Sequence, residues 1–211
     1  MPDLVQIEPR PAGNFSEWLR QTEASLQSGS VGSEVPCGAC TACCRSSMFV
    51  HIAPEEEQTI RRIPRPLLFP APGRPQGHLV MGYNEQGHCP MLVDNRCSIY
   101  QDRPRTCRDY DCRVFRATGV PVDAGAQPDI ALRVREWVFD FESVESRREQ
   151  ATLQQAAAFL VGKKNLFPPG TLPTNPGELA ALAVIIYQQF AAMPEGPDAA
   201  IADAILACLE R

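Results

Sequence analysis

Eight cysteines form two groups whose spacing is typical of metal ligation. The first group is C-x2-C-x2-C-C and the second is C-x7-C-x9-C-x4-C; the predicted ligands are Cys37, Cys40, Cys43, Cys44, Cys89, Cys97, Cys107 and Cys112. Two cysteines separated by two residues lie on a tight turn, which aims both sulfurs at one point. Backbone N–H groups of such a turn can also hydrogen-bond the thiolates. The arrangement suits tetrahedral Zn²⁺ and iron–sulfur clusters alike.

The first group leans slightly towards an iron–sulfur cluster. Bacterial ferredoxin sequences begin C-x2-C-x2-C and add a remote Cys-Pro ligand, a part that Cys89 with Pro90 could play. Cys44 departs from this pattern, because adjacent residues rarely both reach one metal. Either Cys43 or Cys44 is therefore expected to ligate, while the other packs or serves a second centre. We predict zinc or an iron–sulfur cluster, at one centre or two, and a packing role for Cys208.

Two features outside the cysteine groups predict the cellular compartment of the protein. The N-terminal segment MPDLVQIEPRPAG lacks the basic and apolar regions of a secretory signal. The longest apolar run, 179–187, is about half as long as a membrane span. We therefore expect a cytoplasmic protein without membrane attachment, where thiols stay reduced and a disulfide framework is disfavoured. The net charge of −5 predicts no general nucleic-acid binding, which leaves an unidentified protein or small molecule as the partner.

Arginines accompany the candidate ligands along the sequence. A metal held by four thiolates carries net negative charge, which is costly to bury without compensation. Arg45, Arg105 and Arg108 are the predicted outer-sphere residues that offset this charge, and Arg96, Arg103 and Arg113 are further candidates. Solvated surface arginines are the alternative for each of them.

Several segments together resemble a known family. CGACTACCR is followed by CPMLVDNRCSIYQDRPRTCRDYDC, and their order is similar to the YkgJ-like CxxCxxCC cysteine-cluster family, which is proposed to chelate zinc or iron. The resemblance covers about Cys37 to Val114. It implies a metal- or cluster-binding domain carried by the cysteines named above.

The same family is similar to part of the flagellin lysine N-methylases, so an iron–sulfur-dependent redox enzyme or a protein-lysine N-methyltransferase is the alternative function. The sequence has no glycine-rich nucleotide loop that would support a methyl-transfer cofactor, and no catalytic residue can be assigned.

Local patterns predict an α+β fold that is mostly helical and loop-rich, with a small hairpin and a C-terminal helical bundle. We expect three regions: a helix and linker in 1–36, the cysteine-cluster domain in 37–127, and helices in 128–211. A helix should begin at Asn14, and a flexible linker should cover 28–36. Strands are predicted at 48–52, 78–83 and 89–93, the last two forming the hairpin. Turns are predicted at 84–87 and 94–95, and the Pro-rich segment 64–77 should be an irregular loop. Further helices should begin near Pro54, Asn175 and Asp198, the second with Leu179, Leu182 and Ala183 inward. Apolar spacing also predicts a helix over 128–141 and another that includes 153–160.

Other polar residues are expected to be structural. Asp102 should cap the turn around 104–107, and Glu55 to Glu57 should form a solvated helix start. His88 adjoins Cys89, but a solvated turn histidine is the favoured interpretation over a ligand. Trp137 should pack in the core.

Overall fold

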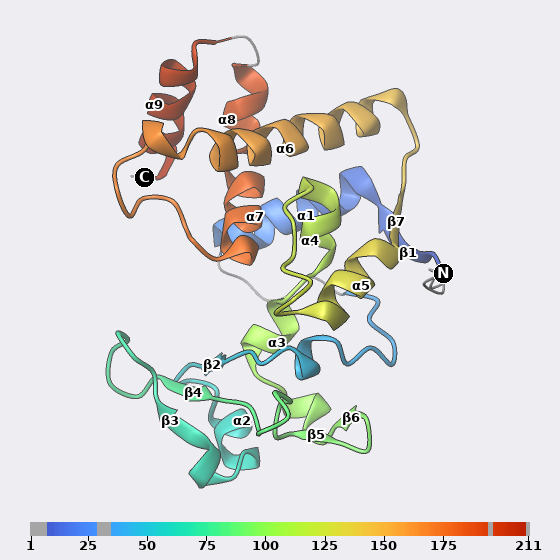
Figure 1. The fold of residues 1–211 in the computed structure, drawn as a ribbon, viewed down its shortest axis with the longest axis vertical. Helices are drawn as coiled ribbons and strands as arrows, with labels where there is room; N and C mark the ends of the chain where they lie inside the picture. Colours follow the sequence, from blue (N-terminus) through green and yellow to red (C-terminus); the bar gives the residue numbers. More distant parts are fainter. Residues whose placement is uncertain (1–7, 29–34, 194–195, 210–211) are drawn as a thin grey trace. The chain divides into compact units, whose positions relative to one another are not determined.

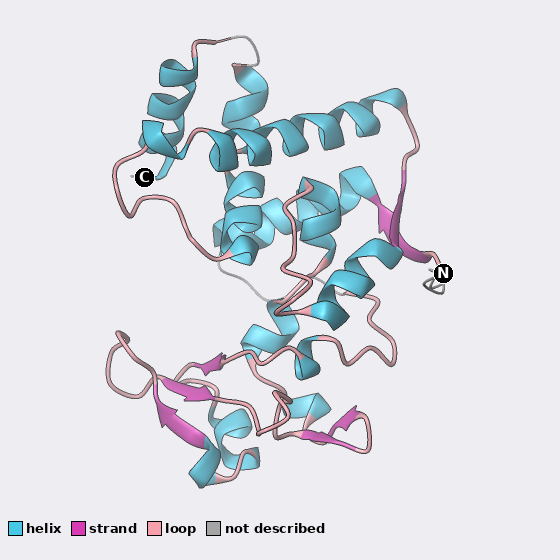
Figure 2. Cartoon of the chain, viewed as in Figure 1, coloured by secondary structure: helices cyan, strands magenta, loops and turns pink. Residues whose placement is uncertain are grey.

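The computed structural model describes residues 8–28, 35–193 and 196–209. It has the predicted α+β composition, with nine α-helices among the described residues and only short strands (Figures 1 and 2). None of these helices combines the length and apolarity needed to cross a bilayer. The predicted linker at 28–36 falls mostly outside the described residues.

The chain forms two compact units that alternate along the sequence. The helical unit comprises Met1–Ser30, Cys112–Val122 and Val134–Arg211, and the cysteine unit comprises Val31–Asp111 and Asp123–Arg133. The chain passes from the cysteine unit to the helical unit within helix α5 (Pro128–Glu136). The predicted sequential boundaries at 36 and 127 stay a prediction of domain organisation.

The helical unit combines a two-stranded parallel sheet with six helices. Figure 1 labels its elements, which are β1 (Arg10–Asn14), α1 (Phe15–Ser28), α4 (Arg113–Thr118), β7 (Trp137–Asp140), α6 (Val144–Gly162), α7 (Pro176–Ile185), α8 (Tyr187–Ala192) and α9 (Asp198–Leu209). Helix α7 packs against α1, α4 and α6. The apolar residues that the sequence assigns to its inner face, Leu179, Leu182 and Ala183, are all buried.

Side-chain caps fix the beginnings of three helices in this unit. The Asn14 side chain accepts a hydrogen bond from the Glu17 N–H at 3.0 Å, as predicted for the start of α1. Asn175 accepts from two backbone N–H groups of α7, and Ser143 forms a capping box at α6. Each cap satisfies backbone donors that have no partner within the helix.

The predicted helix over 128–141 is only half right. Helix α5 ends at Glu136, and the next residues form strand β7, in which Trp137 and Phe139 are buried while Val138 is exposed. Trp137 is aligned with Arg10 of β1 in the parallel pair. Aromatic and β-branched residues favour strands, so the pairing with β1 overrides the helical spacing of Trp137, Val138 and Phe141.

The cysteine unit is built from short elements around a small core. They are β2 (Val50–Ile52), α2 (Glu57–Arg62), β3 (Leu68–Pro70), β4 (Leu79–Met81), β5 (Leu92–Val93), β6 (Arg96–Cys97) and α3 (Arg105–Asp109). Strand β4 lies between β2 and β3 in an antiparallel sheet. The core contains Val50, Ile52, Ile63, Met81, Met91 and Ile99, and Cys89 and Cys97 pack against it.

The predicted hairpin pairing is wrong, although its turn residues are right. The strand near 78–83 pairs with β2 and with β3, which lies in a segment predicted to be an irregular loop. The hairpin is instead β5–β6, with Val93 opposite Arg96. Asp94 and Asn95 both have positive φ, at 48° and 59°. This is the geometry of the two-residue turn that best matches strand twist.

Candidate metal centre

The structure distributes the nine cysteines between the two units, and none of them is in a disulfide. The cysteine unit contains seven: Cys37, Cys40, Cys43, Cys44, Cys89, Cys97 and Cys107. Cys43 and Cys44 lie on a single 3-10 turn, Cys89 precedes β5, Cys97 ends β6, and Cys107 lies on α3. Four separate segments therefore contribute thiols to one small unit.

Backbone hydrogen bonds join the segment of Cys44 to that of Cys89. The Cys89 N–H donates to the Cys44 carbonyl at 2.7 Å, and the Ser47 N–H donates to the Gly87 carbonyl at 2.9 Å. The turn at 84–87 that precedes Cys89 is the one predicted, closed by the Gly87 N–H on the Asn84 carbonyl at 2.9 Å. These bonds hold Cys44 in register with Cys89.

Backbone N–H groups hydrogen-bond two of the sulfurs. The Cys89 sulfur accepts from the N–H groups of Met91 and Leu92, and the Cys97 sulfur accepts from that of Ile99. Donors aimed at sulfur stabilise the thiolate form, which is the form that binds metal. The sequence predicts such bonds for the C-x2-C turns, and the structure has them in the C-P-x-L and C-x-I segments.

The Cys44 thiol donates a hydrogen bond to the Cys89 sulfur. This bond, followed by the N–H groups of Met91 and Leu92, lowers the pKa of Cys89 to about 7, although burial opposes the shift. The pKa of Cys44 is raised, first because its proton is held in this bond and then by burial and by the charges of Cys89, Cys43 and Cys107. The pair therefore loses its first proton more readily than an isolated thiol and its second less readily.

Cys97 and Cys107 lie within electrostatic range of Cys89. Burial, with the charge of Cys89, raises the pKa of Cys97, while the Ile99 N–H and Arg103 oppose this. Cys107 is exposed as a residue, but protein atoms crowd its sulfur. That burial, with the charges of Cys89 and Cys97, raises the pKa of Cys107 to about 12. Four thiols that penalise one another's ionisation form a donor set suited to a cation, because a bound metal reverses this repulsion.

The sulfurs do not form a finished coordination shell in this conformation. Among the described residues, no three His, Cys, Asp or Glu side chains are grouped closely enough to hold a metal ion. Cys44 and Cys89 are in hydrogen-bond contact, whereas Cys97 and Cys107 are their electrostatic neighbours. Cys37 and Cys40 are joined by a turn, in which the Cys40 N–H donates to the Cys37 carbonyl at 3.0 Å. The ligand roles of Cys37, Cys40 and Cys43 stay predictions.

Cys112 belongs to the helical unit, unlike the other seven candidates. The Trp137 indole N–H donates to its sulfur at 3.1 Å, and the exposed fractions of Cys112 and Trp137 are 6% and 1%. Trp137 thus packs in the core as predicted, and Cys112 serves as its acceptor there. The predicted ligand role of Cys112 stays untested. Cys208 lies on α9 and is half-buried.

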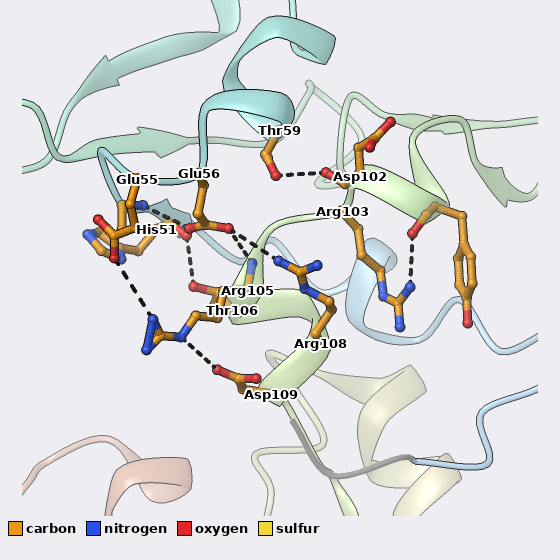
Figure 3. A network of polar contacts seen from close by, with 12 residues as sticks. His51, Glu55, Glu56, Thr59, Asp102, Arg103, Arg105, Thr106, Arg108 and Asp109 are labelled. Carbon is orange, nitrogen blue, oxygen red and sulfur yellow. Dashed lines mark hydrogen bonds and ion pairs between the residues drawn. The ribbon is translucent and has the colours of Figure 1, made fainter. Parts of the chain in front are cut away.

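A buried carboxylate fixes the helix that carries Cys107 (Figure 3). Glu56 accepts from the Ala53 N–H at 2.8 Å and from the Arg105 N–H at 2.6 Å, and its side chain is only 7% exposed. The second bond caps α3 from a distant segment. The Thr106 hydroxyl adds a bond of 2.8 Å to the His51 carbonyl. Glu56 is therefore a central support of α3 and not part of a solvated helix start.

Sequence reasoning missed the role of Glu56, although one signal was present. A glutamate three residues after a helix-starting position can reach back to that residue's N–H, as in a capping box. Ala53, Pro54 and Glu56 have this spacing, and the Glu56–Ala53 bond is of this kind. The contact with Arg105 joins residues 49 positions apart, and no local pattern encodes it.

The predicted outer-sphere arginines bind other polar groups in the cysteine unit. Arg45 donates to the Asn95 side chain at 2.6 Å. Arg105 lies 3.5 Å from Asp109 and 3.9 Å from Glu55, and Arg108 lies 3.9 Å from Glu56. A pocket of about 580 Å³ is lined in part by Arg105, Arg108, Glu55 and Glu56.

Arg103 carries a charge that acts on two of the candidate ligands. Its charge opposes the upward pKa shifts of Cys97 and Cys107. The side chain is held in place by a bond of 2.9 Å to the Tyr100 carbonyl and by stacking 4.1 Å over the Tyr100 ring. Arg103 therefore supplies the compensating charge expected beside thiolates.

Asp102 and the histidines have structural contacts. The Asp102 side chain pairs with Arg62 at 2.9 Å and its carbonyl accepts from Thr59, so the predicted cap of α3 by Asp102 is wrong and Glu56 takes that place. His51 and His78 share a hydrogen bond of 2.9 Å. Burial, followed by the charges of His78 and Arg74, lowers the pKa of His51.

Replacing Glu56 by glutamine is expected to destabilise the cysteine unit by about 1–3 kcal/mol, because the amide nitrogen cannot accept one of the two buried N–H groups. Glu57→Gln is the matched control. Its side chain is 69% exposed and makes one surface ion pair with Arg61, so a change below about 0.5 kcal/mol is expected. Urea unfolding measures both variants, and equal losses would contradict the capping role of Glu56.

Comparison with known proteins supports metal binding by the central segment. Residues 36–121 match the family model CxxCxxCC, described as "Putative zinc- or iron-chelating domain". The predicted resemblance to a CxxCxxCC cysteine-cluster family is thereby confirmed for this segment. No curated protein and no solved structure matches the chain significantly. The comparisons add nothing for or against lysine methyl transfer, which stays a prediction.

Proposed function

We propose that the cysteine unit binds a zinc or iron centre through Cys44, Cys89, Cys97 and Cys107, and that this centre stabilises the fold of the unit. The observation that carries the proposal is the backbone N–H groups aimed at the sulfurs of Cys89 and Cys97, next to a Cys44 thiol in hydrogen-bond contact with Cys89. The family match of residues 36–121 supports the same two metals.

The assignment separates Cys44 from Cys43. Cys44 is held in register with Cys89 by the backbone bond between them, whereas Cys43 is exposed. Completing a four-thiolate shell requires the sulfurs of Cys97 and Cys107 to come closer to that of Cys89, a change that metal binding would drive. Cys37, Cys40 and Cys43 remain candidates for a second centre.

A bound metal would stabilise a loop-rich unit that has only a small apolar core. The apolar cluster of the cysteine unit has six buried residues, and the segments with the four thiols come from four places along the chain. Structural metal sites contribute folding free energy directly. Metal-binding free energy then becomes folding free energy.

The test is to purify the native protein without oxygen and to measure zinc, iron and acid-labile sulfide per chain. Zinc without sulfide would identify a mononuclear structural site. Iron with matching sulfide and a brown colour would identify a cluster. Protein that is folded and free of both metals after this preparation would overturn the proposal.

A further inference from the structure

We propose that Cys44 and Cys89 form a reversible disulfide when the cysteine unit meets a peroxide, which makes the metal centre sensitive to oxidation. The metal-release part rests on the proposed function. Formation of the disulfide rests only on the placement of two thiols, and it can be measured in metal-free protein.

The backbone sets a separation that a disulfide can bridge. The Cys89 N–H donates to the Cys44 carbonyl at 2.7 Å. Cys44 lies on a 3-10 turn, and this single N–H···O=C bond places it directly beside Cys89. A disulfide needs α-carbons about 4.4–6.8 Å apart, a separation that two residues joined by one backbone hydrogen bond can adopt. The side chains already point towards each other, since the Cys44 thiol hydrogen-bonds the Cys89 sulfur. Joining the two sulfurs therefore requires little movement of the backbone.

A small oxidant can reach the pair. Cys44 and Cys89 are both partly exposed, and the segments that hold them are fixed by the bonds on either side, from Ser47 to Gly87 and within the turn at Asn84. Cys97 and Cys107 are neighbours of Cys89 by charge and lack a comparable backbone bond to it among the described contacts. The geometry thus favours a disulfide between Cys44 and Cys89 over one between Cys89 and either Cys97 or Cys107.

The reaction balances with hydrogen peroxide as the two-electron oxidant. One sulfur attacks the peroxide, the O–O bond breaks, and that cysteine becomes a sulfenic acid with release of one water. The second thiol attacks this sulfur, the S–S bond forms, and a second water leaves. The two thiols lose two electrons and two protons in total. A dithiol reductant reverses the step by thiol–disulfide exchange.

Oxidation removes two of the four proposed ligands together. Sulfur in a disulfide no longer carries the thiolate charge that binds the metal. Cys97 and Cys107 would remain as two ligands, which is too few for a closed structural site. We therefore expect metal release to follow formation of the disulfide.

The pairing is tested on metal-free, reduced protein treated with one equivalent of hydrogen peroxide. Remaining thiols are alkylated, and mass spectrometry with peptide fragmentation assigns the linked residues. The expected product is a Cys44–Cys89 linkage that a dithiol reductant removes. Cys37–Cys40, Cys43–Cys89 or any other pair as the main product would overturn the proposal, as would Cys44 and Cys89 that both remain alkylatable.

Adjacent cysteines supply the matched variants. Cys44→Ser should lower the yield of disulfide at Cys89 by at least about tenfold, whereas Cys43→Ser should leave it within about twofold, because only Cys44 lies in register. A second arm treats metal-loaded protein and follows released metal with a coloured chelator. Protein that never binds metal counts against the proposed function, while the mapping in the first arm still decides the pairing.

Discussion

Replacing Cys89 by serine is expected to reduce metal content to near zero and to destabilise the cysteine unit. Cys89 is the thiol that interacts with Cys44, Cys97 and Cys107, so its loss affects the whole donor set. Removing an outer-sphere partner of a metal ligand costs about 10–100-fold in affinity. Loss of a ligand itself should exceed the upper end of that range. Metal analysis and a competitive chelator titration measure the effect.

Cys208→Ser is the control for this experiment. Cys208 lies on α9 in the helical unit, away in sequence from every candidate ligand. Its replacement should leave metal content unchanged. A Cys89→Ser protein with full metal content, or a Cys208→Ser protein that loses its metal, would show that the ligand assignment is incorrect.

Replacing Leu19 by alanine is expected to destabilise the helical unit by about 2–5 kcal/mol, the range for truncating a buried leucine. Leu19 is 3% exposed on α1, which packs against α6 and α7. Truncation removes apolar burial and leaves a cavity between these helices. Thermal and urea unfolding of the variant measure the change in the free energy of unfolding.

Leu26→Ala, on the same helix, is the matched control. Helical spacing places Leu26 on the inner face with Phe15, Trp18 and Leu19, but it is 38% exposed while the other three are buried. The expected cost is below about 1 kcal/mol, because less apolar area returns to water. Equal costs at both positions would mean that the burial of α1 differs from that described.

Local signals in the sequence are sufficient to predict helix starts and turns. Asn14 and Asn175 can be recognised as caps because a cap is defined by residues within one helical turn. The turns at 84–87 and 94–95 follow from the same reasoning, since asparagine, aspartate and glycine tolerate the backbone angles required. The cysteine spacing is also a local signal, because a C-x2-C turn by itself directs two sulfurs towards one metal.

Long-range pairing cannot be predicted from these signals. Strand β7 depends on β1, more than a hundred residues away, whereas Trp137, Val138 and Phe141 fit a helix by spacing alone. The proposed choice of Cys44 over Cys43 rests on a backbone bond to residue 89. Similarly, nothing near Glu56 shows that its carboxylate caps a helix that starts at Arg105.

The alternation of the two units along the chain also sets an order of events during synthesis. All residues of the cysteine unit have been synthesised once Arg133 is added to the chain. The core of the helical unit is complete only after Ile205 on α9 has been added, because this side chain is fully buried. At translation rates of about 5–20 residues per second, that delay is roughly 4–14 s. The proposed metal centre can therefore assemble on a nascent chain whose helical core is still incomplete. Helix α1, the first helix made, is among the last elements to pack against its neighbours.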